Sequence, residues 1–592
     1  MTGSPAASGR AVPRSRVHAG AAGFALVLLA CALAAAAPRA RAADRDDTGA
    51  PAAAADPAGP VHAPAPATAE AMDWGTAADS IVLARCQGAP VRRVEVRCLD
   101  LFDPLPEGRM RGLYAFANRL HVRTRVSTVR AQVLMARGDV WSADRVRESE
   151  RLLRDLGYVE ADPILSRLAG DSVDVRVVTH DQWTTRPELN LERGGGKTYG
   201  SVGLTEKNLL GLGVAVALSF RQDPTGRTRS GSLHGQRLLG GPLEAQLRAG
   251  TGSGGVTNAA FLRDPFRSLD DPRSWTVSWS RASADQQLFR SGSLVARFPY
   301  RVEMAQVEYA FGRRRSDGLV RRFAFALALQ DRRFGTTVPE PGHAGAFPGG
   351  DEELKLRWAS ARVVLWLPRW IERQGVDKFD PIEDFDVGSL VSMECGLVLR
   401  ALGSTADEGL ARLRLEMGRE TRRFGFGLAR GRLSTRLRGD SRETLGSLDA
   451  RWVQQPGRDL SLVLAAYGEV ADRALRESQV VIGGLNGLRA YPVHALAGTQ
   501  VWRFNAESRW VAARRVADLV SFGGALFVDA ARAWDPGGLG EAWHHDAGFG
   551  LRFSFPKATQ NQVARLDVAF PLSPTRDGRR EPVFSFGSSQ AF

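Results

Sequence analysis

From about residue 185 onward, large apolar residues alternate with small or polar ones in short segments that Gly, Asp, Pro and Arg interrupt. In residues 214–221 the even positions are large and apolar, and residues 243–248 and 411–417 place Glu, Gln and Arg on one side. This dyad repeat is typical of strands that face lipid on one side and a polar lumen on the other. At about 9–11 residues per strand plus a turn, residues 185–592 accommodate a transmembrane antiparallel β-barrel of about sixteen strands.

The end of the chain favours a barrel over a soluble β-sandwich, which would also alternate. Phe584, Phe586 and the terminal Phe592 share one face of the last segment. Because a membrane barrel must seal its last edge, we expect this segment to be the closing strand. Two polar stretches, residues 336–353 and 372–388, are predicted to be long extracellular loops.

The first 42 residues have the organisation of a secretory signal peptide. Basic residues precede an apolar run over residues 21–37, and Ala40-Arg41-Ala42 offers a cleavage site. A lipoprotein processing box at Cys31 is the alternative, but the apolar run continues beyond it. Residues 43–87 are rich in Ala, Pro, Asp and Gly, and they are predicted to form a disordered tether.

Residues 88–184 are predicted to form a compact α+β module with the order β-α-α-β-β. Ser142 is a suitable N-cap for its longer helix, and Gly157 ends that helix. The predicted elements are a strand over 91–97, helices over 128–136 and 143–156, and strands over 164–168 and 172–179.

Composition agrees with a barrel without requiring one. The chain is 44% hydrophobic and 24% charged, as in a soluble protein, because barrel lumens are polar. The net charge of +14 comes from Arg spread along the chain, with no basic run interleaved with aromatics, so nucleic-acid binding is not expected. Scattered Arg suits a lumen wall or anionic headgroups, which makes outer-membrane lipids and lipopolysaccharide expected partners.

The cysteines suggest one covalent link and no metal site. Cys86 and Cys98 lie in a segment expected in the periplasm, where a disulfide is permitted, and two free thiols are the alternative. Cys395 has the parity of Met393 and Leu397, so we expect it to face lipid. No Cys or His set has metal-ligand spacing.

No signature of catalysis or of a cofactor is evident. Gly170-Asp171-Ser172 has the letters of an esterase motif, but these residues also favour a β-turn. His544-His545-Asp546 resembles part of a metal site, yet no third ligand is apparent. The Gly-rich runs lack P-loop spacing, and a G-x-S-x-G elbow is absent.

Three motifs follow one another along the predicted barrel. An Asn-Leu-x-Gly-x-Gly sequence, with Asn208, Gly211 and Gly213, lies near its start. A Leu-Arg-Ala-Tyr sequence lies at residues 488–491, and residues 505–509 and 525–530 follow it at a suitable distance. With one module before a barrel, these motifs resemble the BamA/TamA and two-partner secretion translocator superfamily of outer-membrane proteins, surface-antigen type, in which POTRA domains precede the barrel.

The resemblance identifies Arg489 as the arginine of the family's lid loop. A guanidinium inside a lumen is costly unless paired, so the resemblance implies a bidentate salt bridge from Arg489 to Asp529, with Glu507 and Tyr491 completing the lock. An exposed Arg489 is the alternative. Ala490 and Ala531 stand where the family has Gly, which is expected to loosen the docking of the loop.

The resemblance implies a non-enzymatic factor that assembles or translocates proteins at the outer membrane, with its module in the periplasm. The module would capture unfolded clients by adding their strand to the 172–179 or 164–168 edge, and the barrel would insert or pass them. Accessory periplasmic or lipoprotein subunits are candidate partners. The alternatives are a translocator for one dedicated partner, a passive outer-membrane pore, an outer-membrane lipid hydrolase, and a module that only orients the barrel.

Overall fold

The computed structural model describes residues 74–592 except 195–196, 224–225, 254, 291, 422–423, 440, 473–477, 485–486, 536–541, 559–562, 575–580 and 588–592. The predicted signal peptide, most of the predicted tether and the terminal Phe592 therefore lie outside the described residues. Within the described part of the chain, no helix is both long enough and apolar enough to cross a membrane.

Residues 74–184 form the predicted α+β module around a four-stranded sheet. The long strand β4 is its centre, because β1 pairs with it in parallel on one side while β2 and β3 pair with it antiparallel on the other. The elements are α2 (Ser80–Cys86), β1 (Val91–Leu99), α3 (Arg111–Leu120), α4 (Val126–Arg130), α5 (Ala143–Leu156), β2 (Val159–Ala161), β3 (Leu165–Ala169) and β4 (Ser172–Asp181).

Of the two client edges expected from the sequence, the one at residues 172–179 is not available, because β4 pairs with β1 on one side and with β2 and β3 on the other. The other expected edge, residues 164–168, lies on β3, which pairs with β4 and forms a bridge between Ser166 and Gly75. The strand β1 pairs with β4 alone among the named strands of the sheet, which leaves its other edge open beyond its first residues.

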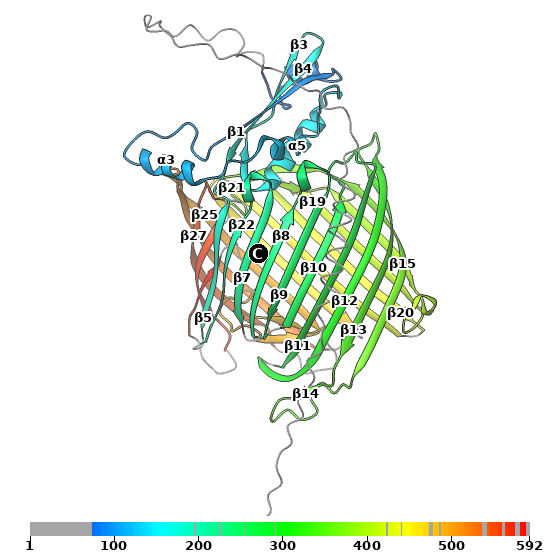
Figure 1. Cartoon of the computed structure of the whole chain (residues 1–592). Helices are drawn as coiled ribbons and strands as arrows, with labels where there is room; N and C mark the ends of the chain where they lie inside the picture. Colours follow the sequence, from blue (N-terminus) through cyan, green and yellow to red (C-terminus); the bar gives the residue numbers. More distant parts are fainter. Residues whose placement is uncertain are drawn as a thin grey trace, which may run out of the picture. The chain divides into compact units, whose positions relative to one another are not determined.

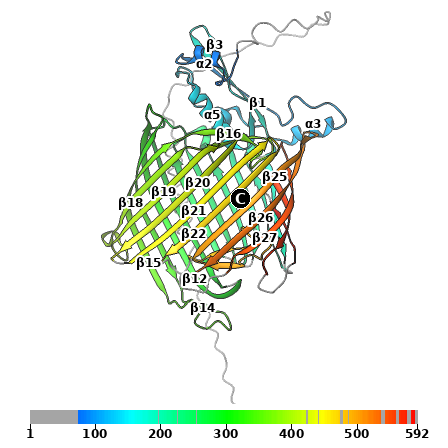
Figure 2. The same ribbon diagram turned by 180° about the vertical axis from the view of Figure 1, so that it is seen from behind.

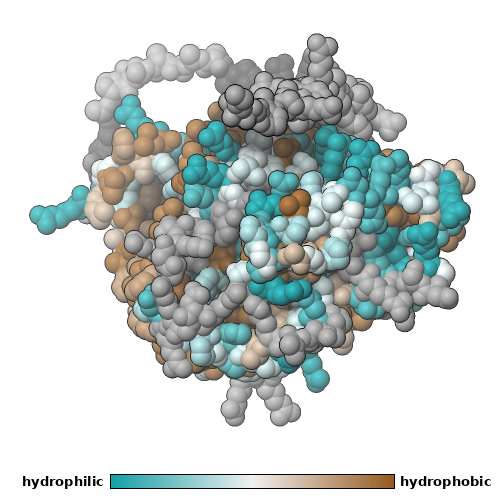
Figure 3. Space-filling model, turned by 90° about the horizontal axis from the view of Figure 1, so that it is seen from below, coloured by the Kyte–Doolittle hydropathy of each residue, from teal (hydrophilic) through white to brown (hydrophobic). Residues whose placement is uncertain are grey.

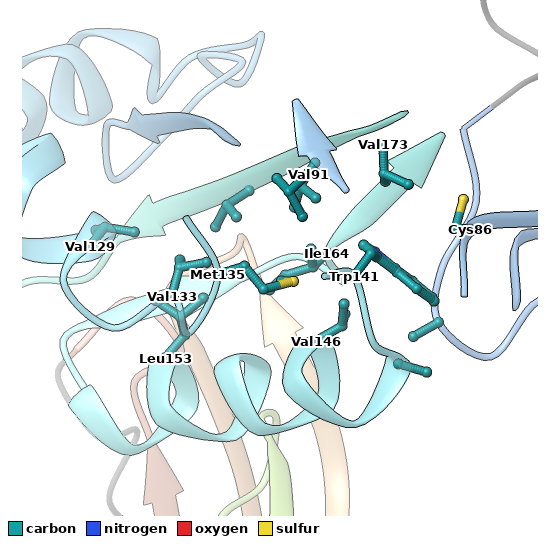
Figure 4. Close-up of a cluster of buried hydrophobic side chains, with 14 of the residues drawn as sticks. Cys86, Val91, Val129, Val133, Met135, Trp141, Val146, Leu153, Ile164 and Val173 are labelled. Carbon is teal, nitrogen blue, oxygen red and sulfur yellow. The ribbon is translucent and has the colours of Figure 1, made fainter. Parts of the chain in front are cut away.

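The core of the module lies between α5 and the sheet. Trp141, Val146, Leu153 and Ile164 are fully buried there and point toward one another (Figure 4). The indole Nε1 of Trp141 donates to Ser166 Oγ at 3.0 Å, so its one polar atom is satisfied.

Two helical predictions need correction. Ser142 is the N-cap residue of α5 as predicted, but its side chain makes no capping hydrogen bond; Gly157 ends the helix as predicted with φ +66°. The predicted helix over 128–136 is shorter than expected, since α4 ends at Arg130 and Leu134 N–H donates to Ser149 Oγ. The helix α3 was not predicted.

The N-terminal boundary of the module also differs from the prediction. Residues 80–86 of the predicted tether form α2, and its Val82 and Cys86 are buried in the core of the module. Asp79 starts this helix by accepting a hydrogen bond from Ile81 N–H at 2.8 Å. The module therefore starts near residue 74.

The predicted disulfide does not form. Cys86 and Cys98 are both free and buried. Cys86 is the last residue of α2, whereas Cys98 lies near the end of β1. Burial raises the pKa of both thiols, so they behave as small apolar groups.

Residues 185–587 form a closed antiparallel barrel of 20 strands (Figure 1). The strands are β5 (Thr185–Gly194), β6 (Lys197–Glu206), β7 (Val214–Asp223), β8 (Gly226–Gly235), β9 (Glu244–Gly252), β10 (Gly255–Asp264), β11 (Arg273–Arg290), β12 (Ser293–Arg314), β13 (Val320–Phe334), β15 (Glu352–Leu367), β18 (Ser389–Val398), β19 (Glu408–Thr421), β20 (Gly425–Arg438), β21 (Ser441–Gly457), β22 (Leu460–Asp472), β25 (Gln500–Val516), β26 (Val520–Trp534), β27 (His544–Ser554), β28 (Val563–Pro571) and β29 (Val583–Gly587).

The predicted number of about sixteen strands is therefore wrong, although the fold class is confirmed. Hairpin turns are very short, as between β21 and β22, where Gly457 and Leu460 end and begin consecutive strands. The estimate allowed more residues per turn than the chain uses. The predicted closing strand does close the ring, since Phe584, Ser585 and Phe586 of β29 pair with β5.

The outer wall is apolar over a limited height. On β13, Phe323, Phe325, Leu327 and Leu329 are exposed on one face, and the next positions of that face are Asp331 and Arg333. Met393, Cys395 and Leu397 are likewise exposed on β18, as predicted. Hydrophobic residues gather on the flank of the barrel at the left of Figure 3. An apolar wall bounded by charges is what a lipid bilayer requires.

Alternation of strand direction defines two rims. The strand β5 starts directly after the module, so we call the rim at Thr185 the module rim and the opposite one the far rim. Counting strands from β5 places the 335–351 loop, with the short β14 (Val338–Pro339), at the far rim. The 368–388 loop returns to the module rim, where it forms a hairpin of β16 (Trp370–Gln374) and β17 (Ile382–Asp386) (Figure 2). The two loops therefore cannot both be extracellular, and that prediction is wrong.

Candidate functional site

The lid loop, residues 483–495, enters the lumen from the far rim. It joins the paired strands β23 (Val480–Ile482) and β24 (Leu496–Gly498). Gly483 has φ +143°, and a Cβ there would collide with the carbonyl oxygen of Pro492, so glycine is needed for the narrow neck of the loop. Gly484 N–H donates to the carbonyl oxygen of Tyr491 at 2.7 Å and closes the neck.

Arg489 extends from this loop to the inner wall, and its side chain is only 2% exposed. Its Nε and Nη2 donate to the two carboxylate oxygens of Asp529 on β26 at 2.7 and 2.9 Å. Its Nη1 donates to Glu507 on β25 at 3.0 Å. The guanidinium carbon lies 3.3 Å from the ring centroid of Phe527, which adds a cation–π contact. The structure thus brings together Arg489, Asp529 and Glu507.

The lock is one part of a larger buried charge network. Glu507 also accepts hydrogen bonds from Arg509 Nε at 3.2 Å and from Arg552 Nη2 at 3.1 Å. Asp567 accepts from Arg552 and from Arg565, and it lies 3.8 Å from Arg489. Charges of both signs therefore alternate across β25, β27 and β28.

The negative charges of the surrounding carboxylates keep the Arg489 guanidinium protonated. Burial alone would lower its pKa, but Asp529, Glu507 and Asp567 together raise that pKa above the ordinary arginine value. Removal of one partner of a buried ion pair costs about 3–5 kcal/mol, because the other charge remains buried and unpaired. Arg489 is therefore one strong attachment of the lid loop to the wall.

Tyr491 and Ala490 dock the loop against β27. The Tyr491 hydroxyl lies 3.0 Å from the carbonyl oxygen of His545 and 2.8 Å from that of Ser573. Its single O–H is shared as a donor by these two acceptors. Ala490 N–H donates to Asp546 at 3.0 Å. Ala490 and Ala531 are both buried in one apolar cluster with Tyr491, so methyl groups fill the space at the two positions where the family has glycine.

The lid loop reaches across the lumen. Gln479, just before β23, exchanges two hydrogen bonds of 2.7 Å with the main chain of Phe289 at the end of β11. The rings of Phe289 and His494 lie 4.2 Å apart. In the ring of 20 strands, β11 is the seventh and β26 the seventeenth, so these contacts join opposite walls.

The motif at residues 208–213 forms the first hairpin of the module rim. Asn208 Oδ1 accepts from Gly213 N–H at 2.6 Å, and its Nδ2 donates to Thr124 of the module at 2.8 Å. The carbonyl oxygen of Gly211 accepts from Arg125 N–H at 3.1 Å and from Thr128 Oγ1 at 2.9 Å. The motif therefore fastens the module to the barrel.

We expect Gly211→Ala to weaken this junction. Gly211 has φ +73°, and a Cβ would lie 2.5 Å from the carbonyl oxygen of Arg123, so strain and collision together cost about 2 kcal/mol. Hydrogen exchange at residues 123–130 should accelerate. Gly240→Ala is the matched control, since Gly240 has φ +75° in the next hairpin with nothing within 4 Å. Equal exchange in both variants would contradict this role.

Comparison with known proteins finds likeness at the level of the fold. BamA from Haemophilus ducreyi lacking POTRA domains 1–3 is 13% identical, with 84% of each chain covered and a TM-score of 0.37. CdiB from Acinetobacter baumannii is 12% identical over 85% of this chain and 74% of that one, with a TM-score of 0.40. CdiB from Escherichia coli is 11% identical over 84% and 76%, with a TM-score of 0.41. No protein-family model and no curated protein matches the chain.

These likenesses concern architecture alone. BamA gives its name to the superfamily that the sequence motifs resemble. At such identities and TM-scores, the function has to be argued from the geometry of the lid loop, the module and the wall.

Several members of the charge network were not singled out from the sequence. Arg565, Asp567, Arg552, Arg509 and Asp546 were not assigned to the lid-loop site from the sequence. The sequence does indicate that Arg552 and Asp546 face inward. Both occupy even positions of β27, whereas the apolar Leu551 and Phe549 occupy odd positions and face outward. Which inward charges meet depends on strand register, which alternation alone does not reveal.

The sequence candidates for other chemistry lie in ordinary surroundings. Gly170 has φ +65° in the tight turn between β3 and β4, as expected of a β-turn. His545 Nδ1 lies 3.3 Å from Ser573 Oγ, and Asp546 binds the lid loop. Among the described residues, no group of three or more His, Cys, Asp or Glu side chains is arranged to hold a metal ion.

Proposed function

We propose that the protein is a non-enzymatic outer-membrane factor that captures unfolded proteins with its module and inserts or passes them through its barrel. The observation that carries this proposal is the lid loop, which crosses the lumen and is held at Arg489 by polar contacts. We infer that the docked loop holds the barrel in its working shape, so that undocking the loop impairs insertion. A passive pore would have no use for it.

The module supplies a way to capture clients. The open edge of β1 presents unpaired main-chain groups, to which an extended segment of another protein adds by β-augmentation. Affinity would come from main-chain hydrogen bonds, so the sequence of the client would matter little. We propose this edge in place of the 172–179 or 164–168 edge expected from the sequence.

The seam of the barrel suggests insertion into the membrane over passage. The first and last strands of the ring, β5 and β29, meet at this seam, where Phe584, Ser585 and Phe586 pair with Arg193, Glu192 and Leu191. Because the chain does not continue directly from β29 to β5, we infer that the wall opens sideways toward lipid at this seam. A client strand could then pair with the exposed edge of β5 or β29.

Locking the seam tests this proposal. Leu191 and Phe586 face each other across it, so the double variant Leu191→Cys, Phe586→Cys is expected to form a disulfide. We expect the oxidised protein to stop accelerating the folding of a urea-unfolded small barrel in liposomes, and reduction to restore it. Leu204→Cys, Leu218→Cys, a pair between β6 and β7, is the matched control. Unchanged acceleration with the seam locked would favour passage through the lumen.

A further inference from the structure

The β16–β17 hairpin folds back from the module rim into the barrel and lies against the inner wall. The tip of this hairpin, residues 375–381, contacts strands on the other side of β18 and β19. One buried apolar cluster contains Ile371, Val376, Phe385 and Val387 from the hairpin segment and Phe426, Leu428, Val453 and Val463 from β20, β21 and β22.

Side chains of the wall bind the hairpin mainly through main-chain carbonyl groups at its tip. Four side chains of the wall donate to four carbonyl oxygens: Gln455 to that of Gln374 at 2.9 Å, Ser461 to that of Gly375 at 2.9 Å, Arg509 to that of Val376 at 3.1 Å, and Arg514 to that of Phe379. Every residue type carries such a carbonyl, so these donors do not distinguish one sequence from another.

Two acidic side chains add to the main-chain contacts. Arg451 binds both carboxylate oxygens of Asp377, with one N–O distance of 2.8 Å, and Arg509 lies 3.5 Å from the same carboxylate. Ser521 Oγ donates to Asp380 at 2.9 Å. The wall therefore favours a segment that carries an acidic residue between exposed carbonyls.

We propose that Arg451, Gln455, Ser461, Arg509, Arg514 and Ser521, which we call the wall cradle, form a binding site for an extended polypeptide segment, and that the hairpin is its resident occupant. A client segment would replace the hairpin carbonyl for carbonyl, so the exchange would be nearly balanced in hydrogen bonds. This inference rests on the proposed function, because the incoming segment belongs to a client.

The hairpin is also held from the module, which provides a means of release. Arg154 on α5 donates to both carboxylate oxygens of Asp384 at 2.7 and 2.8 Å and to Glu372 at 2.8 Å. The guanidinium of Arg151 lies 5.0 Å from the ring centroid of Trp370. A client that displaces these contacts loosens the hairpin at its base before it reaches the cradle.

Release of the hairpin is measurable without a client. Val463 is fully buried beneath it, so in Val463→Cys the thiol should react slowly with a membrane-impermeant maleimide, read by peptide mass spectrometry. We expect Asp377→Ala to accelerate labelling by about tenfold or more, because Arg451 loses its partner. Glu394→Ala is the matched control, since Glu394 pairs with Arg412 at 3.1 Å in the wall away from the hairpin.

The hairpin contains a carboxyl group that makes its release depend on pH. Burial, and then the charge of Asp377, raise the pKa of Glu383 from an ordinary 4.5 to about 7, with Arg451 of β21 and Arg373 across the hairpin also facing it. The docked state thus favours the protonated form, so docking is strongest below about pH 4.5 and weakens as the pH rises toward 7. The rate at which the maleimide labels the Val463→Cys protein is divided by its rate with glutathione at the same pH. This ratio should rise severalfold over this range, and adding Glu383→Gln should abolish the rise.

A peptide binding assay tests the cradle itself. In a full-length chain with residues 370–386 replaced by a Gly/Ser linker, we expect a synthetic 370–386 peptide to bind, Arg451→Ala to weaken it at least tenfold, and Arg412→Ala to change it little. A urea-unfolded small barrel should compete for the site. The proposal is overturned if the peptide does not bind to well-folded barrel, or if the client never competes. If the client displaces the peptide but its folding is not accelerated, the proposed function is contradicted, whereas the wall cradle is still supported as a binding site.

Discussion

Replacing Arg489 with Ala is expected to reduce client insertion by about a hundredfold or more while the barrel itself stays folded. The variant leaves Asp529 and Glu507 buried without their shared cation, at a cost of about 3–5 kcal/mol to the docked loop, and each 1.4 kcal/mol is a factor of ten. The 20-strand ladder does not depend on the loop. Client folding in liposomes measures the first effect, and heat-modifiable migration of the variant measures the second.

Two further variants separate the charge of Arg489 from its geometry. Arg489→Lys keeps the charge but cannot donate to both oxygens of Asp529, so an intermediate loss is expected. Arg412→Ala removes a wall arginine whose partner Glu394 lies outside the lid-loop network, and it should leave insertion nearly unchanged. If Arg489→Ala lost folding and insertion to the same extent, the lid loop would be a structural element with no separate role.

Trp141→Ala is expected to unfold the module and to abolish client capture. Trp141 is fully buried at the centre of the module core, and truncation of such a side chain costs about 3–5 kcal/mol, a large part of the stability of a domain of about 110 residues. Limited proteolysis should cut the module within residues 74–184 and spare the barrel. Client folding should then proceed at the rate seen without protein.

The neighbouring residue provides the control for that variant. Val140 is 57% exposed, so Val140→Ala should change stability by less than about 0.5 kcal/mol and leave capture intact. Full client acceleration by Trp141→Ala protein with a demonstrably unfolded module would refute the role of the module in capture.

The fold class followed from the sequence because alternation is imposed by the bilayer. Residues such as Leu218 and Met393 must face lipid wherever a strand crosses, so parity alone revealed the barrel. The number of strands did not follow, because it depends on the length of each turn. The 372–388 loop was assigned to the outside from its polar composition, and composition does not distinguish one rim of a barrel from the other.

The lid loop was found through its motif, and its surroundings were not. Arg489 required an acidic partner, and Asp529 and Glu507 stood in the motifs that follow. The contacts of Arg552, Asp567 and Arg509 arise from the register of β25, β27 and β28, which no local pattern encodes. The wall cradle is still less visible in the sequence, because its ligands are main-chain carbonyls that every residue provides.

The most direct test of the account is the folding of a urea-unfolded small barrel in liposomes that contain the mature protein. The account predicts faster folding of the client with the intact protein, and loss of that acceleration with Arg489→Ala or with residues 74–184 removed. No acceleration by protein that migrates as a folded barrel would contradict it, as would equal acceleration by all three proteins.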